Sequence, residues 1–200
     1  MDRARYLIAL VSLVVLVPGA PFWLIIHTWA RWWRKLGPAL TYLIVVPPLI
    51  FLGVFVYRAR RLLLSADLGT NWVLIAIAAV FYALEVPLEL QYWKYLSIST
   101  LTGVPELSSP EKRKGKLLRE GIYGVVRHPR YLSAVLGLIG QGLFCNNVGL
   151  YVFLLLLVPV GWLTVTLEER ELVDRFGEAY RQYQREVPPL IPRRLRVFSR

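Results

Sequence analysis

The sequence predicts an all-α integral membrane protein with about five transmembrane helices and a C-terminal amphipathic helix. Three observations indicate this class. The chain of 200 residues is 56% apolar, with a mean hydropathy of +0.49, which is too apolar for a soluble domain. Its longest uncharged stretch, residues 131–167, covers 37 residues and has a turn signal in its middle. Lys and Arg residues gather between the apolar stretches, as they do in membrane proteins.

The first predicted span runs from Tyr6 to Ile26 without a charge, which is long enough for a hydrocarbon core of roughly 30 Å. Two arginines precede it, so a signal peptide is an alternative. The apolar run is long for a signal peptide and continues past the small residues at 18–20, where cleavage would occur. We therefore expect a retained helix, kinked near Pro18 and Pro21.

Two further spans follow before the long polar loop. Ala39 to Tyr57 is the second, with Pro47 and Pro48 inside it, and Asn71 to Glu89 is the third. Each has the length that a membrane helix needs. The segment between the first two spans is basic, and we expect it to be a loop.

The uncharged stretch 131–167 is predicted to be a helical hairpin that forms spans four and five. The residues Asn146, Asn147 and Gly149 divide it into two halves of about 18 residues and are strong turn formers. One helix of this length would exceed the membrane thickness. A hairpin returns the chain to the side that it left, so the polar segments before Tyr131 and after Leu167 should face each other.

Five spans place the termini on opposite sides of the membrane. The first loop, the third loop and the tail carry 19 of the 24 Lys and Arg residues, and the other side carries 5. The positive-inside tendency therefore predicts a cytoplasmic C-terminus and an external N-terminus. The chain is a single membrane-embedded domain over 1–200, divided into spans (1–95), cytosolic loop (96–130), hairpin (131–167) and closing segment (168–200).

Composition excludes several function classes. The net charge of +11 flanks apolar spans, where anionic lipid headgroups are the natural partner, so we expect membrane lipids as partners and no nucleic acid. A single cysteine, Cys145, excludes a disulfide framework and a cysteine-based metal site. Two histidines far apart in sequence, His27 and His128, make no metal set. The activity must therefore lie in or at the bilayer.

A polar block before span four is the first candidate site. Arg127, His128, Tyr123 and Tyr131 fall within nine residues beside two glycines. A histidine before proline is often only a structural hydrogen-bonding group. The neighbouring arginine and tyrosines instead favour a binding site for a polar ligand with a flat ring. Pro129 is expected to start the helix, because proline is tolerated at a first helical position.

Acidic residues at the same side of the membrane are the second candidate. Glu168 and Glu169 point about 100° apart on a helix, so at least one should face the protein, where it could bind a ligand ammonium. The alternative is that they only terminate the span. Glu85 and Glu89 share one helix face at the end of span three and are candidates for contacting substrate or water; interfacial pairing with a basic residue is the alternative.

After span five the pattern changes to that of an amphipathic helix. Apolar and aromatic residues recur at helical spacing, which predicts one continuous face. The members of this face are Glu169, Leu172, Phe176, Tyr180 and Tyr183. Pro188 and Pro189 should end the helix.

Together these motifs resemble the isoprenylcysteine carboxyl methyltransferase and phospholipid methyltransferase superfamily. The resemblance covers roughly residues 115–192 and lies in two blocks with their order intact. The first block is Gly121-x-Tyr123-x-x-x-Arg127-His128-Pro129-x-Tyr131. The second is Glu168-Glu169-x-x-Leu172-x-x-x-Phe176-Gly177-x-x-Tyr180-x-x-Tyr183-x-x-x-Val187-Pro188, followed by Ile191-Pro192.

The resemblance implies a membrane enzyme that uses S-adenosylmethionine at the cytosolic face and methylates a lipophilic acceptor entering from the bilayer. Its short chain with five spans is similar to prokaryotic members, in the plasma membrane. It implies that Glu168 binds the ammonium of the methyl donor. The other implied donor-binding residues are Gly115, Lys116, Leu117, Leu118, Tyr123, His128, Pro129, Arg130, Tyr131, Tyr180 and Tyr183.

The family's substrate-contacting arginine is replaced here by Thr164, which brings a prenylcysteine carboxylate into question as the acceptor. Arg127, Arg170 or Arg175 could take the place of this arginine, and Arg127, Glu169 and Arg175 are expected to have catalytic roles. An amine acceptor, as in phospholipid N-methylation, would need deprotonation by Glu85, Glu89 or His128. Two other readings stay open, an NADPH-dependent membrane sterol-type reductase with a similar Arg-His-Pro block, and a non-catalytic membrane protein.

Overall fold

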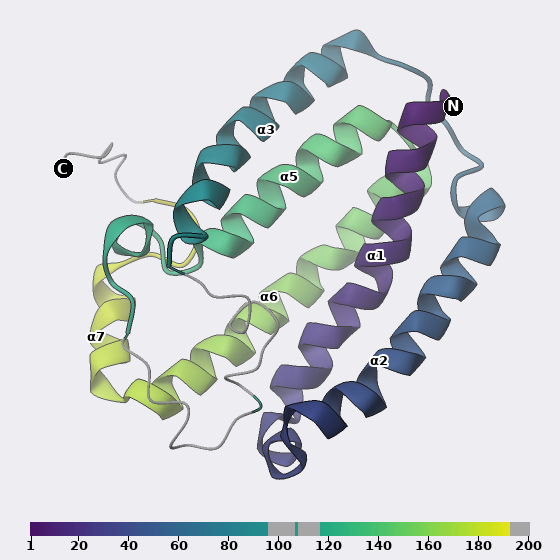
Figure 1. Cartoon of the computed structure of the whole chain (residues 1–200). Helices are drawn as coiled ribbons and strands as arrows, with labels where there is room; N and C mark the ends of the chain where they lie inside the picture. The colour runs from purple at the N-terminus through teal and green to yellow at the C-terminus, as the bar shows by residue number, and fades with distance from the viewer. Residues whose placement is uncertain (96–106, 108–116, 193–200) are drawn as a thin grey trace.

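The computed structural model describes residues 1–95, 107 and 117–192, and the regular elements within these residues are all helices (Figure 1). This confirms the predicted all-α class. The helices are α1 (Arg3–Thr28), α2 (Ala30–Leu63), α3 (Trp72–Tyr92), the short 3₁₀ helix η1 (Gly121–Gly124), α5 (Pro129–Cys145), α6 (Val148–Phe176) and α7 (Glu178–Glu186).

Within the described residues, α1, α2, α3 and α6 are long and apolar enough to cross a membrane. Helix α5, the fourth predicted span, has 17 residues and is shorter than the roughly 20 that a perpendicular span needs. Large apolar side chains are widely exposed on these helices, for example Phe51 at 74% and Leu155 at 71%. Such continuous apolar surface is that of an integral membrane protein.

The basic segment between the first two spans is helical, which corrects the predicted loop. Only Trp29 separates α1 from α2, and Arg31, Arg34 and Lys35 lie in the first turns of α2. The chain changes direction at Gly37, whose φ of 77° is accessible to glycine and not to most residues. Because Pro38 follows and fixes its own φ, α2 restarts there, and the predicted span Ala39–Tyr57 lies in this second part.

The hairpin turn is where the sequence predicted it. Asn146 adopts a left-handed conformation with φ of 44° and ends α5. The side-chain oxygen of Asn147 accepts hydrogen bonds from the N–H groups of Gly149 and Leu150 at 3.0 and 3.4 Å, which caps α6. Helices α5 and α6 therefore fold back on each other and bring residues 127–131 to the same end as residues 168–176.

The predicted C-terminal amphipathic helix is present as α7, but the predicted face begins in α6, because Gly177 divides the closing segment into two helices. Helix α6 continues to Phe176, and Gly177 with φ of 60° breaks it before α7 begins. Figure 1 shows α7 turned away from the axis of α6. The predicted face still packs together, because Leu172 and Phe176 of α6 contact the cluster of Tyr180 and Tyr183 across the break.

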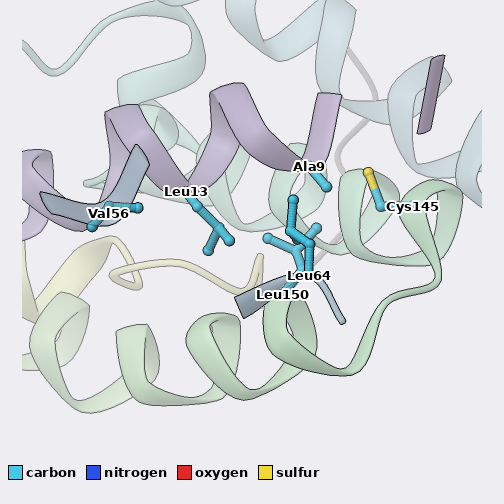
Figure 2. Packing of buried hydrophobic residues seen from close by; sticks show 6 residues of the cluster. All are labelled: Ala9, Leu13, Val56, Leu64, Cys145 and Leu150. Atoms are coloured by element: carbon cyan, nitrogen blue, oxygen red, sulfur yellow. The ribbon is translucent and has the colours of Figure 1, made fainter. Parts of the chain in front are cut away.

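The end of the bundle that contains Asn146 and Asn147, hereafter the turn end, has its own apolar core. Figure 2 shows Ala9 and Leu13 of α1 close to Val56 and Leu64 at the α2 side and to Leu150 of α6, with Cys145 at the edge. Cys145 is fully buried and free. This core holds α1, α2, α5 and α6 together and leaves the opposite end, hereafter the site end, for polar groups.

Candidate functional site

The site end is organised by the Arg127-His128-Pro129 block, which comes between η1 and α5. Gly121, with φ of 59°, starts η1, and Pro129 occupies the first turn of α5 as predicted. The backbone N–H groups of Arg127 and His128 donate to the carbonyls of Pro188 and Pro189 at 2.9 and 3.0 Å. These two hydrogen bonds hold the segment after α7 against the start of α5.

Glu169 of α6 lies at the centre of a buried ion-pair network. Its Oε1 accepts from Nε of Arg127 at 2.8 Å and lies 3.0 Å from Nε2 of His128. Its Oε2 accepts from the side-chain amide of Gln184 at 3.1 Å. The side chains of Arg127 and His128 are only 7% and 3% exposed. Charge-assisted bonds of this kind are among the strongest in proteins, so the hairpin and α7 are fixed to each other here.

The donors of Arg127 are used by the protein itself. Besides Glu169, its guanidinium donates to the carbonyl of Gln184 at 3.0 Å and to the carbonyl of Val187. A guanidinium bound on three sides is suited to hold α7 in place. Its predicted catalytic role stays a prediction.

Glu168 is different from its neighbour. Its side chain is 30% exposed, and its Oε2 lies 4.0 Å from Nδ1 of His128. Among the described residues it has no hydrogen-bond donor within reach. The two adjacent carboxylates therefore diverge as their helical positions predict, and Glu168 keeps its capacity to bind a cation.

Two tyrosines of α7 pack over this network. The Tyr183 hydroxyl donates to the carbonyl of Tyr123, and burial raises the pKa of Tyr183 to about 12, only partly offset by the charges of Arg127 and Arg119. Tyr180 is 1% exposed, and burial, followed by the charge of Glu169, raises its pKa. Its hydroxyl has no hydrogen-bond partner within the described ranges. A buried hydroxyl without a partner is costly and uncommon in folded proteins.

Other residues predicted to bind the donor lie around this network. Leu117 packs against the Tyr180 and Tyr183 cluster, and Leu118 is half-buried beside it in sequence. Tyr131 meets His128 edge to face at 5.7 Å between ring centroids. Arg130 lies over the ring of Trp23 in α1 at 4.7 Å. Gly115 and Lys116 fall outside the described residues.

Four predicted residues do not join the network as the structure places them. Thr164 is 4% exposed, and its hydroxyl donates to the carbonyl of Val160 in its own helix. The Arg175 guanidinium lies over the Phe176 ring at 4.8 Å. Glu89 accepts from the indole N–H of Trp93 at 3.3 Å. Glu85 faces α5 at Gly137, where a side chain would collide with its carboxylate.

Sequence reasoning missed Gln184 of α7 and the contribution of α1. Gln184 follows Tyr180 by four residues and shares its helix face, so the amphipathic pattern could have identified it. His27 and Trp23 gave no such signal, because α1 reaches the site end only through the tertiary packing against α5 and α6. His27 lies 3.3 Å from Glu171 of α6.

Comparisons with known proteins agree on one kind of relative. The phospholipid methyltransferase family matches residues 73–179, which is more than half of the chain and includes α3, α5 and α6. Protein-S-isoprenylcysteine O-methyltransferase of Schizosaccharomyces pombe is 38% identical over 90 residues, which cover 43% of this chain and 38% of that protein.

Two bacterial relatives align over more of the chain. Methanethiol S-methyltransferase 1 of Bradyrhizobium diazoefficiens is 30% identical over 66% of this chain and 45% of its own length. Methanethiol S-methyltransferase of Pseudomonas deceptionensis is 27% identical over 81% of this chain and 63% of its own length. The chain thus spans 38–63% of the length of these three relatives. No solved structure matches the chain significantly.

Proposed function

The chain belongs to the phospholipid methyltransferase family, and on that premise we propose that it transfers a methyl group from S-adenosylmethionine to a lipophilic acceptor. One observation carries the proposal. Glu169 is bound by Arg127 and His128, while the carboxylate of Glu168 beside it is 30% exposed and accepts no hydrogen bond from the described residues. The network of Arg127, His128 and Glu169 is thus fixed by its own hydrogen bonds, and the carboxylate of Glu168 next to it is available to a ligand.

The side chains present fit the methyl donor. The open carboxylate of Glu168 suits an ammonium, and the unpartnered Tyr180 hydroxyl suits a polar ligand atom. Tyr131, against His128, offers an aromatic surface for a flat ring. Residues Tyr123, Pro129 and Tyr183 would close the rest of the donor site.

S-adenosylmethionine supplies a methyl group that is already activated on a sulfonium, so no strong acid is required. What the chain must supply is orientation and exclusion of water. The Arg127–Glu169–His128 network fixes α5, α6 and α7 relative to each other, and Tyr180 and Tyr183 cover it. Positioning of reactants in this way can lower a barrier by about 7–11 kcal/mol.

The acceptor class is proposed from the surroundings of the site. The helices that lead to the site end expose apolar side chains, so an acceptor with an apolar tail can approach within the bilayer. A carboxylate acceptor, similar to a prenylcysteine, would need no base. An amine acceptor, as in a phospholipid, would need one, and His128 is the group nearest to the open carboxylate. The distribution of basic residues supports a cytosolic site, and the bacterial relatives that align over most of the chain support a prokaryotic plasma membrane.

Thiol methylation is a second candidate, because two relatives that cover 66% and 81% of this chain are named methanethiol S-methyltransferases. A small thiol would not need the bilayer to reach the site. It would react as a thiolate, whose formation His128 could assist.

The test separates donor from acceptor. Thermal stabilisation of detergent-solubilised protein by S-adenosylhomocysteine and by NADP⁺ should differ, and S-adenosylhomocysteine at a hundredfold its dissociation constant should add about 2.7 kcal/mol. Stabilisation by NADP⁺ alone would instead establish the reductase alternative. Isotopically labelled methyl donor should then label a prenylcysteine, phosphatidylethanolamine or methanethiol, and labelling of none of these would refute methyl transfer to the proposed acceptors.

A further inference from the structure

Arg130 in the first turn of α5 is held in place without using its hydrogen-bond donors. Its guanidinium lies over the indole of Trp23, 4.7 Å from the ring centroid, and its side chain is half-buried. Within residues 1–95, 107 and 117–192, no oxygen accepts from it. An arginine has five N–H donors, and stacking on an aromatic face leaves their outward edges available.

Trp23 is itself held in place by His27. Its ring stacks on His27 at 5.6 Å with an interplanar angle of 21°. His27 lies 3.3 Å from Glu171 of α6, and the Arg34 guanidinium lies 3.8 Å from the same carboxylate. A ladder of contacts therefore runs from α6 through His27 and Trp23 to Arg130, so the guanidinium is preorganised.

Arg130 lies on the side of Tyr123 and Glu168. Burial is the main reason that the pKa of Tyr123 is raised, and the charge of Glu168 raises it further while the charge of Arg130 lowers it. Glu171, to which His27 and Trp23 connect Arg130, follows Glu168 by three residues and shares its face of α6, so Arg130 and Glu168 belong to the same side of the site end. Helix α5 also begins here without a side-chain cap, and the partial positive charge of a helix start adds to that of the arginine.

The other arginines near the site are occupied or turned elsewhere. Arg127 donates to Glu169 and to two carbonyls, and Arg175 lies over Phe176. Arg130 therefore differs from Arg127, whose donors are taken up by the protein itself.

We propose that Arg130, positioned by Trp23, is the anion-binding residue of the site and takes a carboxylate or phosphate group of a bound ligand. The inference rests on the proposed methyl transfer. Two ligands could supply the anion: the α-carboxylate of the methyl donor, beside the ammonium at Glu168, or the anionic group of the acceptor. In both cases the planar guanidinium forms paired hydrogen bonds to two oxygens.

The experiment compares Arg130→Gln with wild type in two arms. In the donor arm, the dissociation constant of S-adenosylhomocysteine is measured by calorimetry in detergent. In the acceptor arm, binding of N-acetyl-S-farnesylcysteine is compared with that of its neutral carboxamide, and phosphatidylethanolamine with diacylglycerol. In one arm the variant should lose at least about tenfold in affinity, because hydrogen bonds between charged groups are stronger than those between neutral groups.

Each outcome decides the inference. Loss of S-adenosylhomocysteine affinity assigns the anion to the donor, and loss of preference for an anionic acceptor assigns it to the acceptor. An Arg130→Gln protein unchanged in both arms overturns the anion site, while a wild type that binds no probe overturns the proposed function and the inference with it.

Conservative variants separate positioning from folding. Trp23→Leu should weaken the same arm several-fold, and Trp23→Phe should restore it, because phenylalanine keeps an aromatic face. The change should fall on the dissociation constant or KM and leave kcat nearly unaltered. Arg61→Gln, an exposed arginine at the end of α2, is the matched control and should behave as wild type. Equal losses of affinity for Trp23→Leu and Trp23→Phe would argue against a role of the Trp23 ring in positioning Arg130.

Discussion

Each end of the bundle is built around a buried arginine, and the two arginines are used differently. At the turn end, Arg5 is 2% exposed and donates to the carbonyl of Cys145 at 2.6 Å, to Asp67 at 2.6 Å and to Thr70 at 3.1 Å. At the site end, Arg127 is bound just as fully, but Glu168 and Arg130 beside it have unused capacity.

The polar groups around the two arginines make the contrast clearer. Asn146 donates to the carbonyl of Gly69 at 2.9 Å, and its own side-chain oxygen accepts from Tyr151 at 3.1 Å. Asn147 caps α6 and donates to the carbonyl of Leu64. By contrast, the Tyr180 hydroxyl at the site end is buried without a partner in the described part of the chain. Satisfied polar groups stabilise a fold, and unsatisfied ones reserve binding energy for a ligand.

Removing Arg5 should have the largest effect on the stability of the protein. Arg5→Met should lower the free energy of unfolding by about 3–5 kcal/mol, because the carboxylate of Asp67 and the carbonyl of Cys145 lose their donor. The measurement is denaturant unfolding in detergent. Affinity for S-adenosylhomocysteine, measured where the variant is folded, should not change. Arg61→Met is the control, and an equal loss for both variants would contradict a structural role for Arg5.

Removing the charge of Glu168 should produce the opposite profile. Glu168→Gln is expected to weaken S-adenosylhomocysteine binding by at least about tenfold with little change in unfolding, because this carboxylate has no donor to lose within the described protein. Calorimetric titration beside a melting curve tests both parts. Glu178→Gln on α7 is a suitable control, since its partners Arg181 and Arg185 are exposed. A Glu168→Gln protein that unfolds readily but still binds would reverse the roles of the two ends.

The helix caps allow a finer comparison between buried and exposed polar groups. Asn147→Ala should cost about 1–2 kcal/mol of stability, at the upper range for a cap, because Asn147 is fully buried and also donates to Leu64. Asn71 caps α3 in the same way but is exposed, so Asn71→Ala should cost less. Unfolding curves of the two variants give the difference directly. Equal costs would mean that burial at the hairpin turn adds nothing.

The sequence was sufficient for the parts that depend on local chemistry. Two asparagines and a glycine placed the hairpin turn, whereas α6 continues beyond the uncharged stretch to Phe176. The same hairpin explains why His128 and the acids at 168–169 come together. Chain reversal depends on nearby residues only, so a pattern in one sequence can reveal it.

The sequence was insufficient wherever a choice depends on tertiary packing. It indicated that one of the two adjacent carboxylates, Glu168 or Glu169, faces the protein. Which of them contacts Arg127 depends on the rotation of α6 about its axis, and this rotation is set by packing against α7 and α1. It also extended one amphipathic helix through Gly177, because spacing alone does not report a backbone break at φ of 60°. Thr164, chosen by resemblance, is turned inward to its own helix.

The smallest expected effect concerns the hydroxyl of Tyr180. Its removal should raise the stability of the ligand-free protein and lower the affinity for ligand. Tyr180→Phe should stabilise the ligand-free protein by about 1 kcal/mol, since a buried hydroxyl without a partner carries a desolvation cost. If a bound ligand satisfies this hydroxyl, the same variant should bind S-adenosylhomocysteine several-fold more weakly. Melting temperatures with and without S-adenosylhomocysteine measure both effects in one experiment. Tyr183→Phe should instead destabilise the ligand-free protein, because its hydroxyl already donates to Tyr123. Destabilisation by Tyr180→Phe without ligand would mean that the hydroxyl is satisfied, and the site end would then resemble the turn end.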